Sequence, residues 1–477
     1  MKKKDILILA IILIIGLALR MYKIDTPLAD FHSWRQVDTA AVARNFTRDG
    51  FNLLKPVYDD LSSIQTGIEN PLGIRMVEFP IYNATFAFFY KYLPIVSLEV
   101  YGRFTSALFS LITIAVLYYF ALKEKNRTAA IATAGIYAIF PFFVFFSRVI
   151  LPESTAVAFM MLSLFFLYIG LSQKKKSILY LIFGGVFFAL SLLSKPTTIF
   201  YSFAAVYLFL RTYKFEVFKK WQPYVFFIIG AVPLILWRIY ILQFPEGIPA
   251  SAWLLTQVNT FEGPKEIFFR PAFFRWMFME RIGTMIFGIY GTVFFILGAV
   301  GKYKNFFLHS ILFSGFVYIF TFQGGNVQHE YYQTIALPMF ALIAGVGVAN
   351  IFEIPSKYIH QIILYPTVFI VFLFSGLFSY YKVKDFYVYP NDLPQIAELI
   401  KTFTAPGDKI VTDRSGDTTL LYLSDRKGAP AVYKSIEELT ELGYTYLVTS
   451  NEGMKEDLKS RGLEIVIETD LYLMVKL

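Results

Sequence analysis

The chain of 477 residues contains no cysteine and only four histidines, and charged residues make up 17% of it. The absence of cysteine excludes disulfides, thiolate metal sites and cysteine nucleophiles, so a bound metal would need histidine or carboxylate ligands. Hydrophobic residues account for 56% of the chain, and the mean hydropathy is +0.54. This composition predicts a polytopic α-helical membrane protein.

The positive charge of the chain, +9 at pH 7, occurs in short clusters beside apolar runs. Such clusters are typical of the cytoplasmic flanks of membrane spans, so the charge does not predict a nucleic-acid partner. Lys2, Lys3 and Lys4 precede the first apolar run, 6–19, which lacks the cleavage site of a signal peptide. We therefore expect a retained first span and a cytoplasmic N-terminus.

The alternation of basic clusters predicts about eleven transmembrane helices, each near the ~20 residues that a span needs. This count depends on Phe79 to Leu93, an apolar run with Pro80 at its start and Pro94 after it, which we interpret as an interfacial or re-entrant outer helix. As a span, it would place Lys123 and Lys174 to Lys176 outside. The predicted spans are 6–19, 105–122, 129–146, 152–171, 178–193, 199–213, 224–242, 282–300, 306–322, 332–352 and 362–381.

Two domains are expected. Residues 1–382 form the transmembrane domain, whose first outer loop, 24–104, holds interfacial helices. Residues 383–477 are soluble in character and lie outside the membrane by the parity of the spans. Their strands and helices alternate, which predicts a small α/β domain whose end forms a hairpin. The expected strands are 409–412, 446–449, 463–467 and 471–475, and the expected helices are 435–442, capped by Ser435, and 453–461.

One turn of this domain, Asp413 to Asp417, is polar enough to bind a ligand. An ordinary connection from a strand to a helix has the same composition and is the simpler interpretation.

The densest polar segment is Asp30 to Phe46, in the first outer loop. Hydrocarbon cannot satisfy its charged groups, so it lies in water or lines a cavity. The predicted topology places further charged and polar groups beside helix ends on the same side, which predicts a shared polar cavity. They are Asp59, Asp60, Glu69, Glu78, Arg103, Arg148, Glu153, Lys195, His329, Glu330, Tyr331 and Tyr332.

At these positions the chain resembles the GT-C superfamily of polyprenyl-phosphate-sugar glycosyltransferases. The resemblance is to glycosyltransferase family 39, which is related to protein O-mannosyltransferases and lipid A aminoarabinose transferases, and it covers essentially the whole membrane part. It rests on the order of several motifs. These are the segment His32 to Phe46, Glu78-Phe79-Pro80, Arg103 to Ala107, Ser147-Arg148 with Pro152-Glu153, Ser194-Lys195-Pro196, and His329 to Tyr332 with Pro338.

The resemblance implies an inverting hexosyl- or pentosyltransferase in the plasma membrane of a bacterium or archaeon. Its donor would be an undecaprenyl- or dolichyl-phosphate sugar, and its acceptor would be a protein, lipid or glycan at the outer face. A flippase or transporter of lipid-linked sugars is an alternative, and so is a polymerase or ligase that uses lipid-linked oligosaccharides. Charges near mid-membrane would favour a transporter, but here they gather on one face.

A carboxylate must take the acceptor proton. We favour Asp38, with Glu78 as the close rival and with Asp30 and Asp59 as further candidates. The chain departs from its relatives here, because Arg35-Gln36 occupies the place where they carry an Asp-Glu pair. The catalytic acid therefore cannot be assigned by position.

The departing phosphate needs cations. Lys195 and Arg148 are the first choices, Arg35 and Arg103 are alternates, and His32 is available to orient the base. Lys195 could equally be an interface anchor, and Arg148 with Glu153 could be a structural ion pair. His329, Tyr331 and Tyr332 line the sugar or lipid site or form an aromatic belt. A divalent metal, if required, would take its ligands from Asp38, Glu78, His32 and His329, with Glu153 as a further donor.

Overall fold

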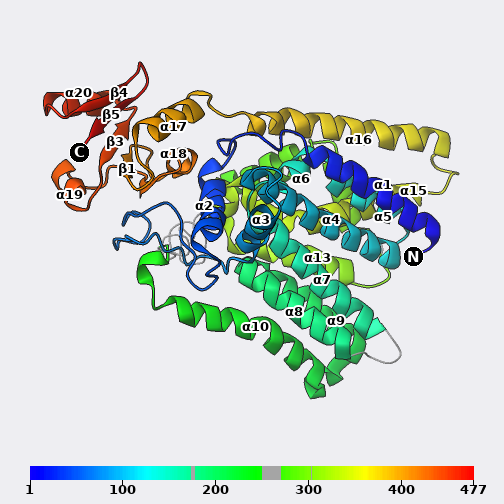
Figure 1. Cartoon of the computed structure of the whole chain (residues 1–477). Helices are drawn as coiled ribbons and strands as arrows, with labels where there is room; N and C mark the ends of the chain where they lie inside the picture. Colours follow the sequence, from blue (N-terminus) through cyan, green and yellow to red (C-terminus); the bar gives the residue numbers. More distant parts are fainter. Residues whose placement is uncertain (173–177, 250–269, 302) are drawn as a thin grey trace. The chain divides into compact units, whose positions relative to one another are not determined.

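The computed structural model describes residues 1–172, 178–249, 270–301 and 303–477. The chain forms two compact units, coloured along the sequence in Figure 1. The helical unit comprises Met1–Ile24, Arg103–Arg238 and Ala252–Asp385, and the mixed unit comprises Asp25–Gly102, Ile239–Ser251 and Phe386–Leu477. The basic cluster 174–176 and residues 250–269 of the loop after the seventh predicted span lie outside the described residues.

Helices occupy the apolar runs of the sequence, as expected. Their bounds in the helical unit and at its borders are α1 Lys3–Arg20, α4 Leu98–Glu124, α5 Arg127–Ile139, α6 Pro141–Phe146, α7 Glu153–Ser172, α8 Ile178–Ser194, α9 Ser202–Tyr213, α10 Trp221–Ile241, α11 Pro271–Phe274, α12 Thr292–Ala299, α13 Phe307–Thr321, α14 Gln323–Gln328, α15 Leu337–Phe352 and α16 Gln361–Val383. Two runs are broken: Pro141 separates α5 from α6, and a π-helix, Arg275–Ile286, precedes α12.

Five helical segments among the described residues are long and apolar enough to cross a membrane, which makes the chain an integral membrane protein. They are Leu98–Glu124, Glu153–Ser172, Trp221–Ile241, Glu330–Phe352 and Gln361–Phe403. Helix α15 is buried along nearly its whole length and packs against α5, α12 and α13. Its glycines permit this close packing, since a Cβ on Gly345 would lie 2.1 Å from the Thr133 hydroxyl of α5.

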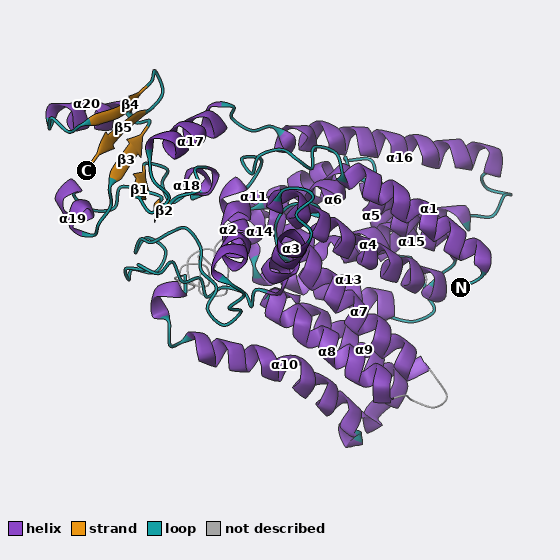
Figure 2. Cartoon of the chain, viewed as in Figure 1, coloured by secondary structure: helices purple, strands orange, loops and turns teal. Residues whose placement is uncertain are grey.

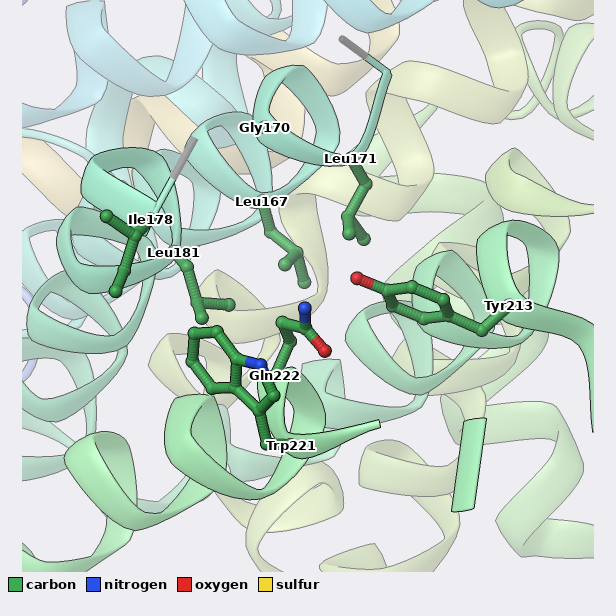
Figure 3. Close-up of a pocket in the computed structure, with 8 residues that line it drawn as sticks. All are labelled: Leu167, Gly170, Leu171, Ile178, Leu181, Tyr213, Trp221 and Gln222. Carbon is green, nitrogen blue, oxygen red and sulfur yellow. The ribbon is translucent and has the colours of Figure 1, made fainter. Parts of the chain in front are cut away.

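One end of the helical unit has a small cavity of about 40 Å³ (Figure 3). It lies where α7 ends, α8 begins, α9 ends and α10 begins, and the Tyr213 hydroxyl and the Gln222 amide point towards the same space (Figure 3). A cavity of this size holds a few water molecules at most, so it is too small for a sugar.

The mixed unit contains the five-stranded sheet, drawn in orange in Figure 2, with the strand order β2-β1-β3-β5-β4. Strand β1 pairs in parallel with β2 and β3, and β5 pairs in antiparallel with β3 and β4. The strands are β1 Lys409–Thr412, β2 Lys427–Ala429, β3 Tyr446–Thr449, β4 Ile465–Glu468 and β5 Leu473–Lys476, and the helices of this region are α17 Asp392–Phe403, α18 Thr419–Leu423, α19 Ile436–Glu441 and α20 Glu452–Ser460.

Most of the expected C-terminal elements are present. The last two strands form the expected hairpin, and Ser435 caps α19 by accepting from the Glu438 amide, while the Glu438 carboxylate accepts from the Ser435 amide. Helices α17 and α18 and strand β2 were not expected. Strand β2 is only three residues long and contains Gly428, so the local sequence does not predict it.

The first loop folds with the C-terminal region in this unit. Helices α2 (Ser33–Asp49) and α3 (Ile81–Tyr92) pack together, and α18 packs against α2. The loop also lengthens the sheet beyond β2, because the Gly428 amide donates to the Asp59 carbonyl at 2.9 Å and the Leu61 amide donates to the Gly428 carbonyl at 2.7 Å. The expected domain boundary at residue 383 stays a prediction.

Candidate functional site

Helix α2 and the loop before α3 are held together by an ion pair between two candidate residues. Arg35 Nη2 lies 2.8 Å from Glu78 Oε1, and the side chains are 8% and 12% exposed. Arg35 Nη1 also donates to the Thr39 hydroxyl, and Asn83 of α3 donates to the Thr39 carbonyl at 2.7 Å. These bonds fix the direction of the Glu78 carboxylate. The Glu78 side chain keeps some exposure to solvent.

Asp38, the preferred base in the sequence analysis, is buried more deeply, at 3% exposed. Its Oδ2 lies 2.8 Å from Arg75 Nη2, and its Oδ1 accepts from the Thr418 hydroxyl at 2.6 Å. Thr418 immediately precedes α18, so Asp38 connects three segments of the mixed unit. Both oxygens are bonded, which suits a structural junction better than proton transfer to a substrate.

The other first-loop candidates are also bonded. Asp30 Oδ1 accepts from the Gln36 amide at 2.8 Å, and His32 precedes α2 with a positive φ of 57°. Asp59 is ion-paired with Arg44, which counteracts the rise that burial causes in the pKa of Asp59.

Asp60, the neighbour of Asp59, is fully buried next to these groups. Its Oδ1 accepts from the Ser62 hydroxyl at 2.6 Å and from the Ser62 amide at 2.9 Å, and its Oδ2 accepts from the Tyr58 hydroxyl at 3.3 Å. Burial is the main cause that raises the pKa of Asp60 to about 6.

In the helical unit, Lys195 pairs with Glu153. Lys195 Nζ lies 2.9 Å from Glu153 Oε1, with Glu153 2% and the lysine side chain 18% exposed. Glu153 begins α7, and Lys195 caps the 3₁₀ helix Pro196–Tyr201. The ion pair that the sequence suggested between Arg148 and Glu153 stays a prediction.

Arg103 and Arg148 are fully buried and bind the turn after α1. Arg103 Nη1 donates to the Ile24 carbonyl and Arg148 Nη1 to the Lys23 carbonyl, each at 2.9 Å. Cations at carbonyls beyond a helix C-terminus stabilise it, so these contacts serve the fold.

The segment that follows α14 gathers aromatic and charged groups. The His329 ring is stacked on the Tyr331 and Tyr332 rings, with centroids 5.5 and 6.1 Å apart. Glu330 forms an ion pair with Arg281 of the π-helix, an arginine that the sequence analysis did not consider. Its position at the edge of the apolar run 282–300 was the available signal.

This segment, Glu330–Ala336, is a 3₁₀ helix that packs against α7, α13 and α14. The Tyr201 hydroxyl donates to the Ile335 carbonyl at 2.7 Å, which ties it to the 3₁₀ helix that Lys195 caps. The structure therefore brings the motifs at Glu153, Lys195 and His329 to Tyr332 into one part of the helical unit.

The expected metal ligands do not assemble in the part of the chain that the structure describes. No group of three or more histidine, aspartate or glutamate side chains there could hold a metal ion. Asp38 and Glu78 are each bonded to an arginine instead. The residues present do not fit a metal centre, and no step is assigned to one.

The fold has counterparts among solved structures. The structure resembles that of ArnT from Cupriavidus metallidurans bound to undecaprenyl phosphate, with a TM-score of 0.67, 12% identity, and 99% of this chain and 97% of that chain covered. The archaeal oligosaccharyltransferase AglB from Archaeoglobus fulgidus, in complex with an inhibitory peptide and a dolichol-phosphate, gives 0.55 and 11%, with 94% and 69% covered. Arabinofuranosyltransferase AftD from Mycobacteria gives 0.57 and 16%, with 97% and 39% covered.

These proteins are GT-C glycosyltransferases, so the chain has the GT-C fold. Residues 82–237 also match the family model described as dolichyl-phosphate-mannose-protein mannosyltransferase. The two findings confirm the resemblance that the sequence motifs predicted. No curated protein matches the chain in sequence.

Proposed function

We propose that the protein is an inverting glycosyltransferase that moves a sugar from a polyprenyl phosphate to an acceptor hydroxyl at the extracytoplasmic face of a bacterial or archaeal plasma membrane. The observation that carries this proposal is the Arg35–Glu78 pair, which keeps a partly exposed carboxylate in one direction at the start of the motif helix α2. The GT-C fold and the family match are the context for it.

In the proposed reaction, Glu78 accepts the proton of the acceptor hydroxyl while that oxygen forms a bond to the anomeric carbon. The bond between this carbon and the polyprenyl-phosphate oxygen breaks at the same time, and the phosphate leaves with the electron pair. A direct displacement of this kind inverts the anomeric centre. Arg35 orients Glu78, and its positive charge favours the carboxylate form that a base requires.

We assign the neutralisation of the departing phosphate to Lys195. The Glu153 carboxylate holds its ammonium group at 2.9 Å, and the side chain is partly exposed. An ammonium group binds phosphate oxygens through charge-assisted hydrogen bonds. Arg103 and Arg148 serve the fold in this proposal, through their carbonyl contacts. His329, Tyr331 and Tyr332 are proposed to line the sugar or lipid site, since their rings are stacked together beside Glu330.

The proposal includes about eleven spans, a cytoplasmic N-terminus and an extracytoplasmic mixed unit. The basic residues Lys2 to Lys4 and Lys123 support this orientation, because basic residues concentrate on the cytoplasmic flanks of membrane spans.

The function is tested with purified protein in lipid nanodiscs, supplied with undecaprenyl- or dolichyl-phosphate sugars labelled in the sugar and with peptide, lipid and glycan acceptors. Mass spectrometry should find one sugar added, with the anomeric configuration inverted. Transfer only from diphosphate-linked oligosaccharides would identify a ligase or polymerase instead. Movement of the lipid-linked sugar across liposomes without any transfer would identify a flippase.

A further inference from the structure

A polar cavity of about 320 Å³ lies within the mixed unit. One face of α17 borders it with Pro394, Ala397, Glu398 and Lys401, which recur at helical spacing. Helix α2 and the segment of α18 form further walls. The cavity is large enough for a small ligand, and none of its residues belongs to the Glu78 or Lys195 pairs.

The charges of the lining balance. Arg44, Arg48 and Lys401 are positive, and Glu99, Glu398 and Asp425 are negative. An anionic ligand such as phosphate would meet three carboxylates, and a cationic ligand would meet three basic groups. A ligand with many hydroxyl groups and no net charge can donate to the carboxylates and accept from the basic groups at once.

The charged groups of the lining are bonded to one another and retain hydrogen-bonding capacity. Arg48 makes two bonds of 2.8 Å to the two oxygens of Asp425, and the Tyr422 hydroxyl donates to Glu99 Oε1 at 2.6 Å. Lys401 Nζ donates to Glu398 at 2.7 Å and has three donors in all. Charged groups of this kind can form charge-assisted hydrogen bonds with the hydroxyls of a ligand.

The guanidinium of Arg44 lines the cavity and is held by several contacts. It stacks on the Tyr422 ring, with 4.3 Å between the guanidinium carbon and the ring centroid, and is ion-paired with Asp59 and Asp425. Arg44 follows Arg35 by nine positions on α2, a rise of about 14 Å along the helix. A ligand bound here would therefore occupy a place well away from the carboxylate that Arg35 orients.

We infer that this cavity binds a neutral, hydroxyl-rich part of the acceptor, that is, a glycan segment distant from the reacting hydroxyl. The inference rests on the proposed function for the identity of the acceptor, but binding itself does not require catalysis. Among the proposed acceptors, which are proteins, lipids and glycans, the inference favours those that carry a neutral glycan.

The test is saturation-transfer NMR with the full-length protein in nanodiscs, without donor, using mannotriose, maltotriose and galactotriose, with trigalacturonic acid as the anionic comparison. At least one neutral trisaccharide should bind, and the acid should not. The double variant Glu398→Ala, Lys401→Ala should weaken binding about tenfold, since hydrogen bonds from charged groups are lost. The matched control is Lys459→Ala with Glu468→Ala, an exposed pair of 2.6 Å in the same unit that does not line the cavity.

Leu423→Trp is a second variant, which should fill the cavity and abolish binding with the ion pairs intact. Absence of neutral trisaccharide binding in the wild type, preference for the acid, or equal binding by both cavity variants would overturn the inference. Failure of the proposed function is separate, because it would appear as absent sugar transfer while trisaccharide binding persists.

Discussion

At the scale of single residues, the carboxylates of the first loop differ in the group that holds them. Glu78 is paired with Arg35, Asp38 with Arg75, and Asp59 with Arg44. Asp60 is instead bonded to the hydroxyls of Ser62 and Tyr58. Burial penalises a carboxylate, and it raises the pKa of Asp60 to about 6.

Asp60 should make the stability of the mixed unit depend on pH. Burial raises its pKa from the ordinary value of 3.8 to about 6. Its stabilising contribution is therefore complete below pH 3.8 and is lost as the pH rises through 6, a difference of about 3 kcal/mol. Thermal unfolding of Asp60→Asn at pH 4 and pH 7 should show a smaller loss of Tm between the two than the wild type shows. An identical loss would contradict the assignment.

Asp38 and Glu78 should respond differently to amide substitution. Asp38→Asn leaves the buried Arg75 guanidinium without its carboxylate, so it should destabilise the protein by about 3 kcal/mol or more. The Glu78 side chain is 12% exposed and the Asp38 side chain 3%, so Glu78→Gln should lower Tm less than Asp38→Asn does. Differential scanning calorimetry of the two variants measures this. Equal Tm values would show that Asp38 is not a structural junction.

At the scale of elements, α18 lies along α2 through a series of polar contacts. Thr418 bonds to Asp38, Thr419 to Ser33, and the Tyr422 carbonyl to Arg44. Asp425 continues the series beyond the end of α18 with its bonds to Arg48. These contacts attach the C-terminal region to the helix that carries the His32 to Phe46 motif.

Arg44 and Arg48 should contribute unequally to the free energy of unfolding. The Arg48 side chain is 51% exposed, so a double-mutant cycle with Asp425 should give a coupling of about 1 kcal/mol or less. The Arg44 side chain is 12% exposed and faces the buried Asp59, so Arg44→Met should cost about 3 kcal/mol or more. Chemical unfolding monitored at the mixed unit compares the two. A larger cost for Arg48 would refute the stated order.

Sequence patterns predicted the elements that local chemistry determines. The Ser435 capping box and the strand 446–449 are examples, because a cap motif and a short run of strand-forming residues each lie within a few positions of the sequence. Strand β2 and helix α18 depend on partners far along the chain, namely residues 59–61 and α2. The Arg75–Asp38 and Arg281–Glu330 pairs depend on distant partners as well, so a single sequence indicates the ionisable residues but not the pairs they form.

At the scale of the whole molecule, the predicted topology places the C-terminal region outside the membrane. The absence of cysteine allows single-cysteine labelling without a background. Glu437→Cys, at an exposed position in α19, should react with a membrane-impermeant maleimide in intact cells. Lys123→Cys should react only after permeabilisation. Labelling of Lys123→Cys in intact cells would show that the topology is the opposite of the one proposed.

The motifs of the sequence correctly predicted the GT-C fold, because their residue types and their order along the chain can be read directly from the sequence. Hydropathy alone does not determine the number of spans. Two apolar runs are broken by Pro141 and by the π-helix, and the hydropathy of a run does not record such breaks.

The central claim, that Glu78 is the base of a polyprenyl-phosphate-dependent sugar transfer, is tested most directly by the transfer rate of Glu78→Gln. The matched control is Glu69→Gln, which alters a first-loop glutamate that pairs with Lys434. Sugar transfer from undecaprenyl- or dolichyl-phosphate donors should fall by at least about a hundredfold in Glu78→Gln, as expected for loss of a general base, and remain near wild type in the control. Transfer by Glu78→Gln at the wild-type rate would contradict the account.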